Sequence, residues 1–268
     1  MMKNVFSRRN RILLRELVIT DFKLRYQGSV LGYAWSILKP LFLFAILYVV
    51  FAVILDIGKG VPHFPVYLLT GVTLWNFFTE TTINGLQSIV NRGDLIRKIN
   101  FPKYIIVISG TISALINLGF NLAVIIIFII INGVEITPRV FLIAPFILEL
   151  YIFGLGIAFF LAAANVKFRD IGYLWEIFLQ AAFYATPIIY PLQLVIAKSV
   201  IAAKIIMLNP VAQSIQDVRY MLVAKNTITT ESMFYDWKVV LPYISILFVC
   251  ILATYYFRNS SKNFAEEI

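Results

Sequence analysis

Residues 104–132 read YIIVISGTISALINLGFNLAVIIIFIIIN, a run that contains no charged side chain. A helix that spans a bilayer needs about 20 mostly apolar residues, because each adds about 1.5 Å against a hydrocarbon layer of about 30 Å. Five further runs have this character: Trp35–Leu55, Phe64–Val90, Val140–Asn165, Ile171–Tyr190 and Val239–Phe257. They are too long and too continuously apolar for strands of a membrane barrel. The sequence therefore predicts an all-α integral membrane protein with six transmembrane helices.

The composition agrees with a membrane environment. Of the 268 residues, 60% are hydrophobic and 14% are charged, whereas soluble domains have about 45–50% apolar and about 25% charged residues. This composition excludes a disordered chain, a nucleic-acid-binding arm and an ordinary soluble enzyme. The net charge of +9 favours anionic partners, first of all the headgroups of membrane lipids. The single cysteine, Cys250, excludes an internal disulfide and a cysteine metal cluster.

Basic loop residues predict the orientation, since Lys and Arg are retained on the cytoplasmic side of a membrane. Seven Lys or Arg residues precede the first span, four follow the second, and two lie between the fourth and the fifth. Arg258 and Lys262 follow the sixth span. The alternate short loops carry only Lys59 and Arg139. Both termini are expected in the cytoplasm, and the polar start is not expected to be a cleaved signal peptide. We expect one domain, 1–268, made of an interfacial segment (1–34), six spans (35–257) that include an external region (191–238), and a tail (258–268).

Two cytoplasmic segments have surfaces suited to partners. Apolar and basic residues alternate over Ser7–Gly28 with the spacing of an amphipathic helix in the inner membrane interface. Its bases would hold anionic lipid or a lipid-linked pyrophosphate, or act only as a positive anchor. The loop Asn91–Lys103 reads NRGDLIRKINFPK. Either it forms a short helix that offers Leu95 and Ile96 to a docking partner, or it is a solvated basic turn.

The external region begins with the two prolines of ATPIIYP (Ala185–Pro191), where a helix should kink or stop. Leu192–Leu208 is too interrupted to span the membrane and is predicted to dip into the outer leaflet and return. Asn209 and Pro210 provide an N-cap followed by proline at the first helical position. We expect an amphipathic helix there that lies on the outer surface; a seventh short span is the disfavoured alternative.

Polar residues recur on one face of the second span. They lie three or four positions apart, at Thr73, Asn76, Glu80, Asn84 and Gln87. Together with Glu149 and Glu176 on the fourth and fifth spans, they allow three readings: a hydrophilic conduit, the acids of a proton relay, or helix–helix hydrogen bonds. Small residues at four-residue spacing predict close helix packing; they are Ser109, Ser113 and Asn117, and Gly154, Ala158 and Ala162.

Aromatic residues make up 15% of the chain, and many lie inside the spans. Aromatic faces suit sugar rings, but they also fill membrane cores. The sequence contains no GxxxxGK[ST] phosphate loop and no HExxH motif, and the lone His63 excludes a Ser/His/Asp set. We read His63 as an interfacial side chain rather than a metal ligand. Any ATP hydrolysis would therefore have to occur on a separate subunit.

The stretch RYQGSVLGYAWSILKPL (Arg25–Leu41) resembles the start of the first span in permease subunits of type-2 ABC exporters of bacterial polysaccharides, which handle O-antigen, capsule and teichoic-acid polymers. The likeness continues, in the same order, through LIRKINFPK (Leu95–Lys103), KFRDI (Lys167–Ile171), TPIIYP (Thr186–Pro191), LNP (Leu208–Pro210) and NFAEEI (Asn263–Ile268). The resemblance implies a homodimer in the bacterial cytoplasmic membrane, driven by a cytosolic ABC ATPase that binds the ATP and Mg. The implied substrate is a glycan on an undecaprenyl-pyrophosphate-type carrier.

The resemblance also implies roles for residues. The surfaces that couple to the ATPase would include Arg92, Asp94, Leu95, Ile96, Arg97, Lys98, Phe101, Lys167, Arg169 and Asp170. A substrate path is expected both from the polar and aromatic residues within the spans and from the likeness to the family. It would include Arg25, Tyr26, Trp35, Tyr48, Trp75, Asn76, Phe77, Glu80, Asn84 and Tyr184. An external gate would include Pro187, Pro191, Asn209 and Pro210. No metal ligand or cofactor site is expected, and Glu80 and Glu149 match no motif of the family.

Three other functions stay open. A proton-coupled carrier would use Glu80 and Glu149. A membrane-embedded enzyme or polymerase would process glycan without an ATPase. A type-2 exporter of drugs or lipids would share the architecture without the polymer.

Overall fold

The computed structural model describes residues 7–26, 28–223 and 225–267, and the regular structure within these ranges is helical. The longer helices are α1 (Arg8–Tyr26), α3 (Phe64–Ser88), α5 (Tyr104–Ile131), α6 (Ile143–Lys167), α7 (Ile171–Ala185) and α12 (Leu241–Ser260). The helix α2 (Trp35–Leu47) continues as the π-helix η3 (Tyr48–Ile54). The shorter helices are α4 (Gly93–Lys98), α8 (Leu192–Ile196), α9 (Val200–Met207), α10 (Pro210–Leu222), α11 (Thr230–Met233) and α13 (Phe264–Glu267). The 3-10 turns are η2 (Gly32–Ala34), η4 (Val90–Arg92), η5 (Pro138–Leu142) and η6 (Asp236–Val240). The predicted all-α class is confirmed.

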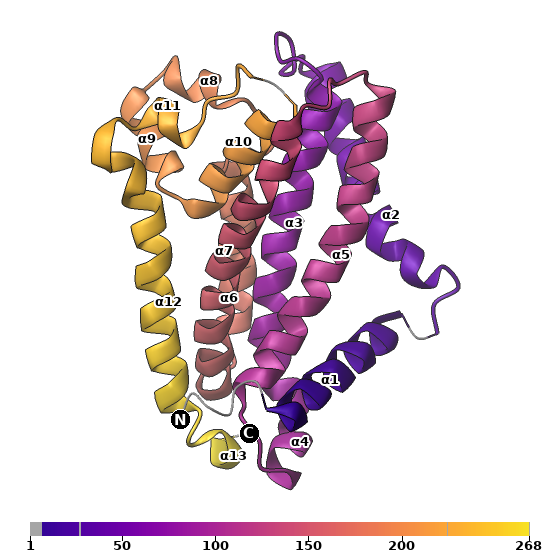
Figure 1. The fold of residues 1–268 in the computed structure, drawn as a ribbon, viewed down its shortest axis with the longest axis vertical. Helices are drawn as coiled ribbons and strands as arrows, with labels where there is room; N and C mark the ends of the chain where they lie inside the picture. Colours follow the sequence, from indigo (N-terminus) through magenta and orange to yellow (C-terminus); the bar gives the residue numbers. More distant parts are fainter. Residues whose placement is uncertain (1–6, 27, 224, 268) are drawn as a thin grey trace.

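The polar-striped helix α3 lies at the centre of the bundle (Figure 1). It packs against α5, α6 and α10, and most of its residues are buried. A Cβ placed on Gly85 would overlap the Cβ of Ala158 on α6, and one on Gly154 would lie 3.1 Å from Thr81 Cγ2. Small residues therefore let α3 and α6 approach closely, as their spacing predicts.

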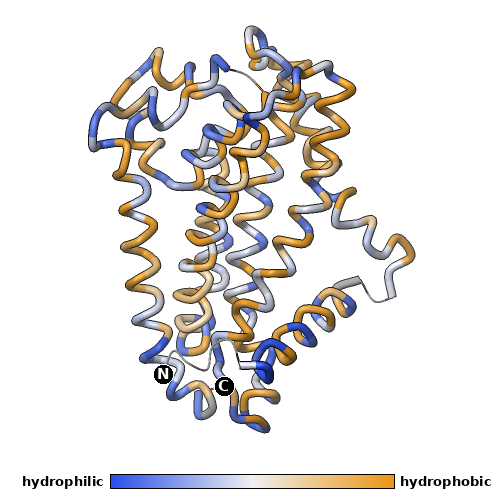
Figure 2. Tube along the Cα trace, viewed as in Figure 1, coloured by the Kyte–Doolittle hydropathy of each residue, from blue (hydrophilic) through white to orange (hydrophobic). Residues whose placement is uncertain are grey.

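Within the described residues, four segments are long and apolar enough to cross a membrane: Gly32–Ile54, Tyr104–Ile131, Pro138–Lys167 and Asp236–Ser260. They correspond to the first, third, fourth and sixth predicted spans. Figure 2 shows hydrophobic residues along these helices and hydrophilic residues gathered toward the two ends of the bundle.

The second and fifth predicted spans are helices of a different kind. The helix α3 is the buried, polar-striped centre. The helix α7 has 15 residues, which is about 22 Å of helix. It ends because Thr186, which precedes Pro187, adopts extended backbone angles (φ −88°, ψ 140°). The predicted fifth span, Ile171–Tyr190, is therefore too long at its C-terminal side.

The two ends of the bundle are formed by different sets of short helices and loops. The end formed by α1, α4, α13 and the α6–α7 connection, here called the basic end, carries Arg8, Arg97, Lys98 and Arg169 among other bases. The opposite end, here called the far end, is formed by α8–α11 and the α2–α3 loop (Figure 1). The helix α1 begins and α13 ends on the basic side (Figure 1).

Candidate functional site

A cavity of about 580 Å³ lies between α2, α3 and α5; we call it the polar crevice. The polar face of α3 forms one wall, and Asn117 and Asn121 of α5 face it. The lining residues from α3 are Thr73, Asn76, Phe77, Thr79, Glu80, Ile83 and Asn84, and those from α2 are Trp35, Ser36, Lys39, Pro40 and Leu43. The polar stripe of α3 therefore lines a cavity between helices of this chain.

Hydrogen bonds order the amide and carboxylate groups of the crevice. Asn117 Nδ2 donates to Glu80 Oε1 over 2.6 Å. Asn121 Nδ2 donates to the carbonyl oxygens of Asn117 (2.8 Å) and Ser36 (3.1 Å), which joins α5 to α2. The buried hydroxyl oxygens of Thr73 and Thr79 have no hydrogen-bond partner among the described residues. The crevice thus combines amide and carboxylate groups fixed by hydrogen bonds with two buried threonine hydroxyls that have no partner in the described part of the chain.

A second, smaller cavity of about 160 Å³ extends the polar face of α3 toward the basic end. Asn84 lines both cavities, and Gln87 lines the smaller one. Asn84 Nδ2 donates to Gly110 O over 3.1 Å. At the basic end, Arg92 of η4 forms an ion pair with Asp21 of α1. Polar groups therefore run from the α1–η4 ion pair to Thr73, along one side of α3.

The structure brings together half of the residues predicted to form the substrate path. Trp35, Asn76, Phe77, Glu80 and Asn84 line the polar crevice. The side chains of Arg25 and Tyr26 lie outside the described part of the structure.

Three predicted aromatic residues lie elsewhere. Trp75 is buried in the core, with ring centroids 5.8 Å from Phe78 and 5.9 Å from Phe183. Tyr48 packs beside Phe44 within the α2–η3 segment. Tyr184 is exposed on α7. These three residues do not share the crevice because their helix positions point them to other faces of the bundle.

Residues predicted to couple to an ATPase lie at the basic end. Of the two alternatives for the loop Asn91–Lys103, the structure shows the short helix, the six-residue α4. The docking role attached to that alternative does not fit Ile96, which is 4% exposed, whereas Leu95 is half-buried. Ile96 packs in an apolar cluster with Leu17 of α1 and Phe264 of α13. The apolar face of the amphipathic helix α4 therefore packs against other helices of the same chain.

The groups that remain exposed at the basic end are mostly charged. Among the residues predicted to couple to the ATPase, Arg92 is half-buried in its ion pair and Phe101 is buried. The other charged residues of that set are exposed. The exposed members are Asp94, Arg97, Lys98, Lys167, Arg169 and Asp170. The apolar side chain of Ile99 is exposed beside α4.

Replacing Phe264 with alanine is expected to loosen α4. Phe264 is fully buried, its ring lies 5.5 Å from that of Phe257, and α13 contacts α4. Losing a buried phenyl ring costs about 3 kcal/mol, so amide hydrogen exchange in α4 should accelerate. Lys262→Ala, at an exposed neighbour, is the control. Unchanged exchange in α4 for the Phe264 variant would show that α13 does not hold α4 in place.

The far end confirms the predicted start of α10. Asn209 Oδ1 accepts from the backbone N–H of Val211 (3.0 Å), and Pro210 occupies the first helical turn. Pro187 and Pro191 bracket the turn between α7 and α8. In place of one dipping helix, Leu192–Leu208 forms the two short helices α8 and α9.

The expectation that α10 lies on the outer surface is wrong. Its residues from Pro210 to Arg219 are buried, and it packs against α6, α3 and α12. The reason is that its polar face finds partners in protein. Arg219 donates to the carbonyl oxygens of Tyr67 (3.0 Å), Pro187 (2.6 Å) and Ile188 (2.6 Å), and its guanidinium carbon lies 3.6 Å from the Tyr67 ring centroid.

The remaining carboxylates do not join Glu80. Gln213 Nε2 donates to Glu149 Oε2 (3.3 Å), Asp217 Oδ2 (3.1 Å) and the Tyr243 hydroxyl (3.2 Å), in a cluster between α6, α10 and α12. Glu176 is exposed on α7. The three glutamates proposed for membrane depth therefore have separate surroundings.

Sequence reasoning missed several residues of these sites. The spacing of Asn117 indicates a packing position, yet Asn117 lines the crevice, and so does Lys39, which no pattern in the sequence marks as part of a polar site. Gln213, Asp217 and Arg219 carry only a weak signal in the sequence. Gln213 and Asp217 lie four positions apart and share one face of α10, whereas Arg219, two positions after Asp217, points to a different face.

Comparison with known proteins places the chain among transporters. The family described as "ABC-2 type transporter" matches residues 12–223. An O-antigen export system permease protein RfbA of Myxococcus xanthus is 28% identical over 257 residues, which are 96% of this chain and 95% of that protein. A protein of the same description from Klebsiella pneumoniae is 28% identical over 260 residues, 93% of each chain.

Proposed function

Because the chain belongs to the ABC-2 type transporter family, we propose that it is the membrane subunit of an ATP-driven exporter. Its cargo would be a lipid-linked cell-surface polysaccharide of the O-antigen, capsule or teichoic-acid type, carried across the bacterial cytoplasmic membrane. The family membership agrees with the resemblance of the ordered motifs. Relatives described as O-antigen export permeases match almost the whole chain, and this supports a glycan as cargo.

The polar crevice is the observation that carries the proposal of a glycan path. Its groups are amides, hydroxyls, one carboxylate (Glu80) and one ammonium (Lys39), beside the rings of Trp35 and Phe77. Hydroxyl-rich sugars are both donors and acceptors of hydrogen bonds, and their C–H faces stack on aromatic rings. A wall of this composition favours a sugar over a purely apolar drug or lipid.

The basic end is the proposed docking surface for the ATPase. The exposed charges of α4 and of the α6–α7 connection would meet the partner, which would bind ATP and Mg. Because Ile96 is packed against α13, we propose that α4, α13 and the end of α12 move together when the partner closes. The ion pair between Arg92 and Asp21 would pass that movement to α1.

The proposed assembly is a homodimer of six-span subunits with both termini in the cytoplasm. The helix α7 buries only Leu179 and exposes Tyr173, Ile177 and Phe178. A second copy would cover this apolar face and enclose α7, which is too short to cross the bilayer alone. The helix α3 would cross the membrane inside the bundle. The turns around Pro187, Pro191 and Asn209, with α8–α10, would form the external gate.

A proton-coupled carrier receives less support from the geometry. Glu80 bonds Asn117 in the crevice, whereas Glu149 bonds Gln213 beside a different cavity. Because Asn117 lies on α5 and Gln213 lies on α10, and the two acids line different cavities, this arrangement gives little support to a relay between them. The proton carrier predicts that Glu80→Gln abolishes transport and that ATP depletion, with the proton gradient maintained, does not.

The decisive experiment removes this chain from its host and analyses lipid-linked glycans. We expect surface polysaccharide to be lost and polyprenyl-pyrophosphate-linked glycan to accumulate inside the cell, with recovery when the wild-type chain is restored. Normal surface glycan would reject the proposal. Transport by the purified chain in sealed vesicles without an ATPase would reject the ATP-driven mechanism.

Reversing two exposed charges at the basic end is expected to uncouple the subunit. Arg97→Glu combined with Arg169→Glu should lower export at least about tenfold, since like charges across a docking surface cost several kcal/mol. Copurification of the ATPase with this chain measures docking, and surface glycan measures export. Lys198→Glu combined with Lys204→Glu, at the far end, is the matched control. Normal ATPase binding by the basic-end variant would place docking elsewhere.

A further inference from the structure

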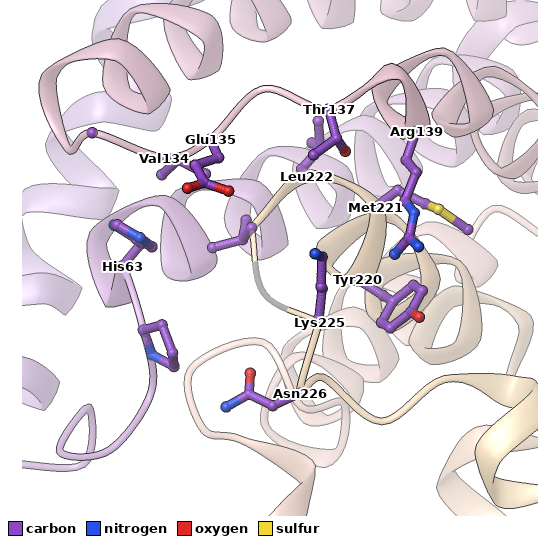
Figure 3. A pocket seen from close by; sticks show the side chains of 13 residues that line it. His63, Val134, Glu135, Thr137, Arg139, Tyr220, Met221, Leu222, Lys225 and Asn226 are labelled. Atoms are coloured by element: carbon purple, nitrogen blue, oxygen red, sulfur yellow. The ribbon is translucent and has the colours of Figure 1, made fainter.

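A cavity of about 450 Å³ opens at the far end, away from the polar crevice. Its walls come from the α2–α3 loop, from the connection between α5 and α6, and from the C-terminal end of α10 with the chain that follows it (Figure 3). The cavity shares no lining residue with the crevice. Neither the coupling surface nor the proposed glycan path uses it.

The chemistry of one side of this cavity is that of an anion site. Arg139 and Lys225 extend into the same space, and the ring of Tyr220 lies near the guanidinium group (Figure 3). Neither base forms an ion pair with another residue of the described ranges. Thr137, Tyr220 and Asn226 add hydroxyl and amide donors to the lining. A guanidinium, an ammonium and neutral donors together match the oxygens of a phosphate group.

The one carboxylate of the lining does not neutralise these bases. Glu135 points toward the His63 side of the cavity, while the Arg139 guanidinium lies toward Tyr220 (Figure 3). The cavity therefore has a basic side, with Arg139 and Lys225, and a separate side with Glu135 and His63. Two cations against one carboxylate leave a net positive lining when His63 is neutral.

The surroundings of Arg139 indicate that the phosphate belongs to a lipid. Arg139 lies in the first turn of the apolar segment Pro138–Lys167, which is the position of the membrane–water boundary. Its neighbours Ile136 and Phe141 are 62% and 84% exposed. Large apolar side chains exposed next to unpaired bases suit a ligand that has both acyl chains and an anionic headgroup.

We propose that this cavity binds the phosphate group of an anionic phospholipid from the membrane leaflet at the far end. Arg139 and Lys225 hold the phosphate oxygens, and the lipid chains lie along Ile136 and Phe141. The bound headgroup links the α5–α6 connection to the end of α10. The proposal does not depend on the cargo of the transporter.

Native mass spectrometry of the full chain in detergent, titrated with phosphatidylglycerol, tests the proposal. Arg139→Gln combined with Lys225→Gln should weaken the tightest phosphatidylglycerol site about tenfold or more, since it removes two charge-assisted contacts. Both side chains are exposed, so the variant should fold. Lys198→Gln combined with Lys204→Gln, which removes two charges of the same end outside the cavity, should leave binding unchanged.

Two further measurements test whether the charges of the cavity and of the lipid headgroup determine binding. Glu135→Gln should strengthen phosphatidylglycerol binding, because it removes the only carboxylate of the lining. Phosphatidylethanolamine, which is zwitterionic, should bind more weakly than phosphatidylglycerol. The proposal is overturned if both double variants weaken binding equally, if the cavity variant binds as the wild type does, or if inorganic phosphate displaces the lipid at comparable concentration.

Discussion

Alanine in place of Gly71 is expected to destabilise the packing of α10 against α3 at the far end of the bundle. A Cβ on Gly71 would collide with the Arg219 guanidinium, with Cζ only 2.9 Å away, and would lie 3.2 Å from Ile188 O. Arg219 is fully buried, so it has no room to withdraw. Its displacement would leave the carbonyl oxygens of Pro187 and Ile188 without their donor.

Unsatisfied buried acceptors cost about 1–3 kcal/mol each, so the loss of the donor to these two carbonyls should lower the stability of Gly71→Ala by at least about 2 kcal/mol. The apparent Tm of the purified protein should fall by at least about 4–8 °C, and Arg219→Ala should have an effect of similar size. Proteolysis between α7 and α10 should accelerate in both variants. Thermal unfolding in detergent and limited trypsin digestion measure these changes.

Gly119→Ala provides the matched control for Gly71→Ala. Gly119 is also a helical glycine, on α5, but a Cβ there meets nothing within 4 Å. Alanine at that position should be neutral or stabilise by about 0.5–1 kcal/mol, the usual helix preference for alanine over glycine. Equal behaviour of the two variants would mean that Arg219 does not hold α10 to α3.

The second large effect is expected from filling the polar crevice. Asn76→Trp places an indole in the space between α2, α3 and α5. If the glycan passes there, export should fall by about 10- to 100-fold, because overpacking of about 1.4 to 3 kcal/mol would be added to the transport barrier. Accumulation of intracellular lipid-linked glycan measures the block, and copurified ATPase shows that the assembly is intact.

Two variants separate a steric block from other effects. Asn76→Ala removes the amide without filling the space and should reduce export much less. Ile127→Trp adds the same ring on the exposed face of α5 and should have little effect. Normal export by Asn76→Trp would place the glycan path outside the crevice.

Helix positions follow directly from the sequence because hydropathy and local chemistry act within one segment. The uncharged run 104–132 corresponds to α5, which ends at Ile131. Asn209 and Pro210 mark the start of α10, as capping rules predict. The polar stripe of α3 identifies the helix face on which the crevice lies, since residues three or four apart share a face.

The partners of each face could not be read from the sequence. The Leu-Ile pair in the loop Asn91–Lys103 allows Ile96 to be offered to a partner, but in the structure Ile96 is buried in one apolar cluster with Phe264, which lies far along the chain. Asn117 and Asn121 join Glu80 and Ser36 only because α5 packs across α3 and α2. Contacts between residues far apart in sequence leave no periodic signal in either segment.

By itself, the sequence determined that this chain is a helical membrane protein and where its helices run. Only the tertiary structure decided that α10 is buried, that α3 is the central helix and that Arg219 bonds carbonyl oxygens of α3 and the α7–α8 turn. The physical reason is that a polar helix face must be satisfied by water or by protein. The spacing of residues in the sequence reveals a polar helix face. The packing of segments far apart in the sequence determines whether that face contacts water or protein.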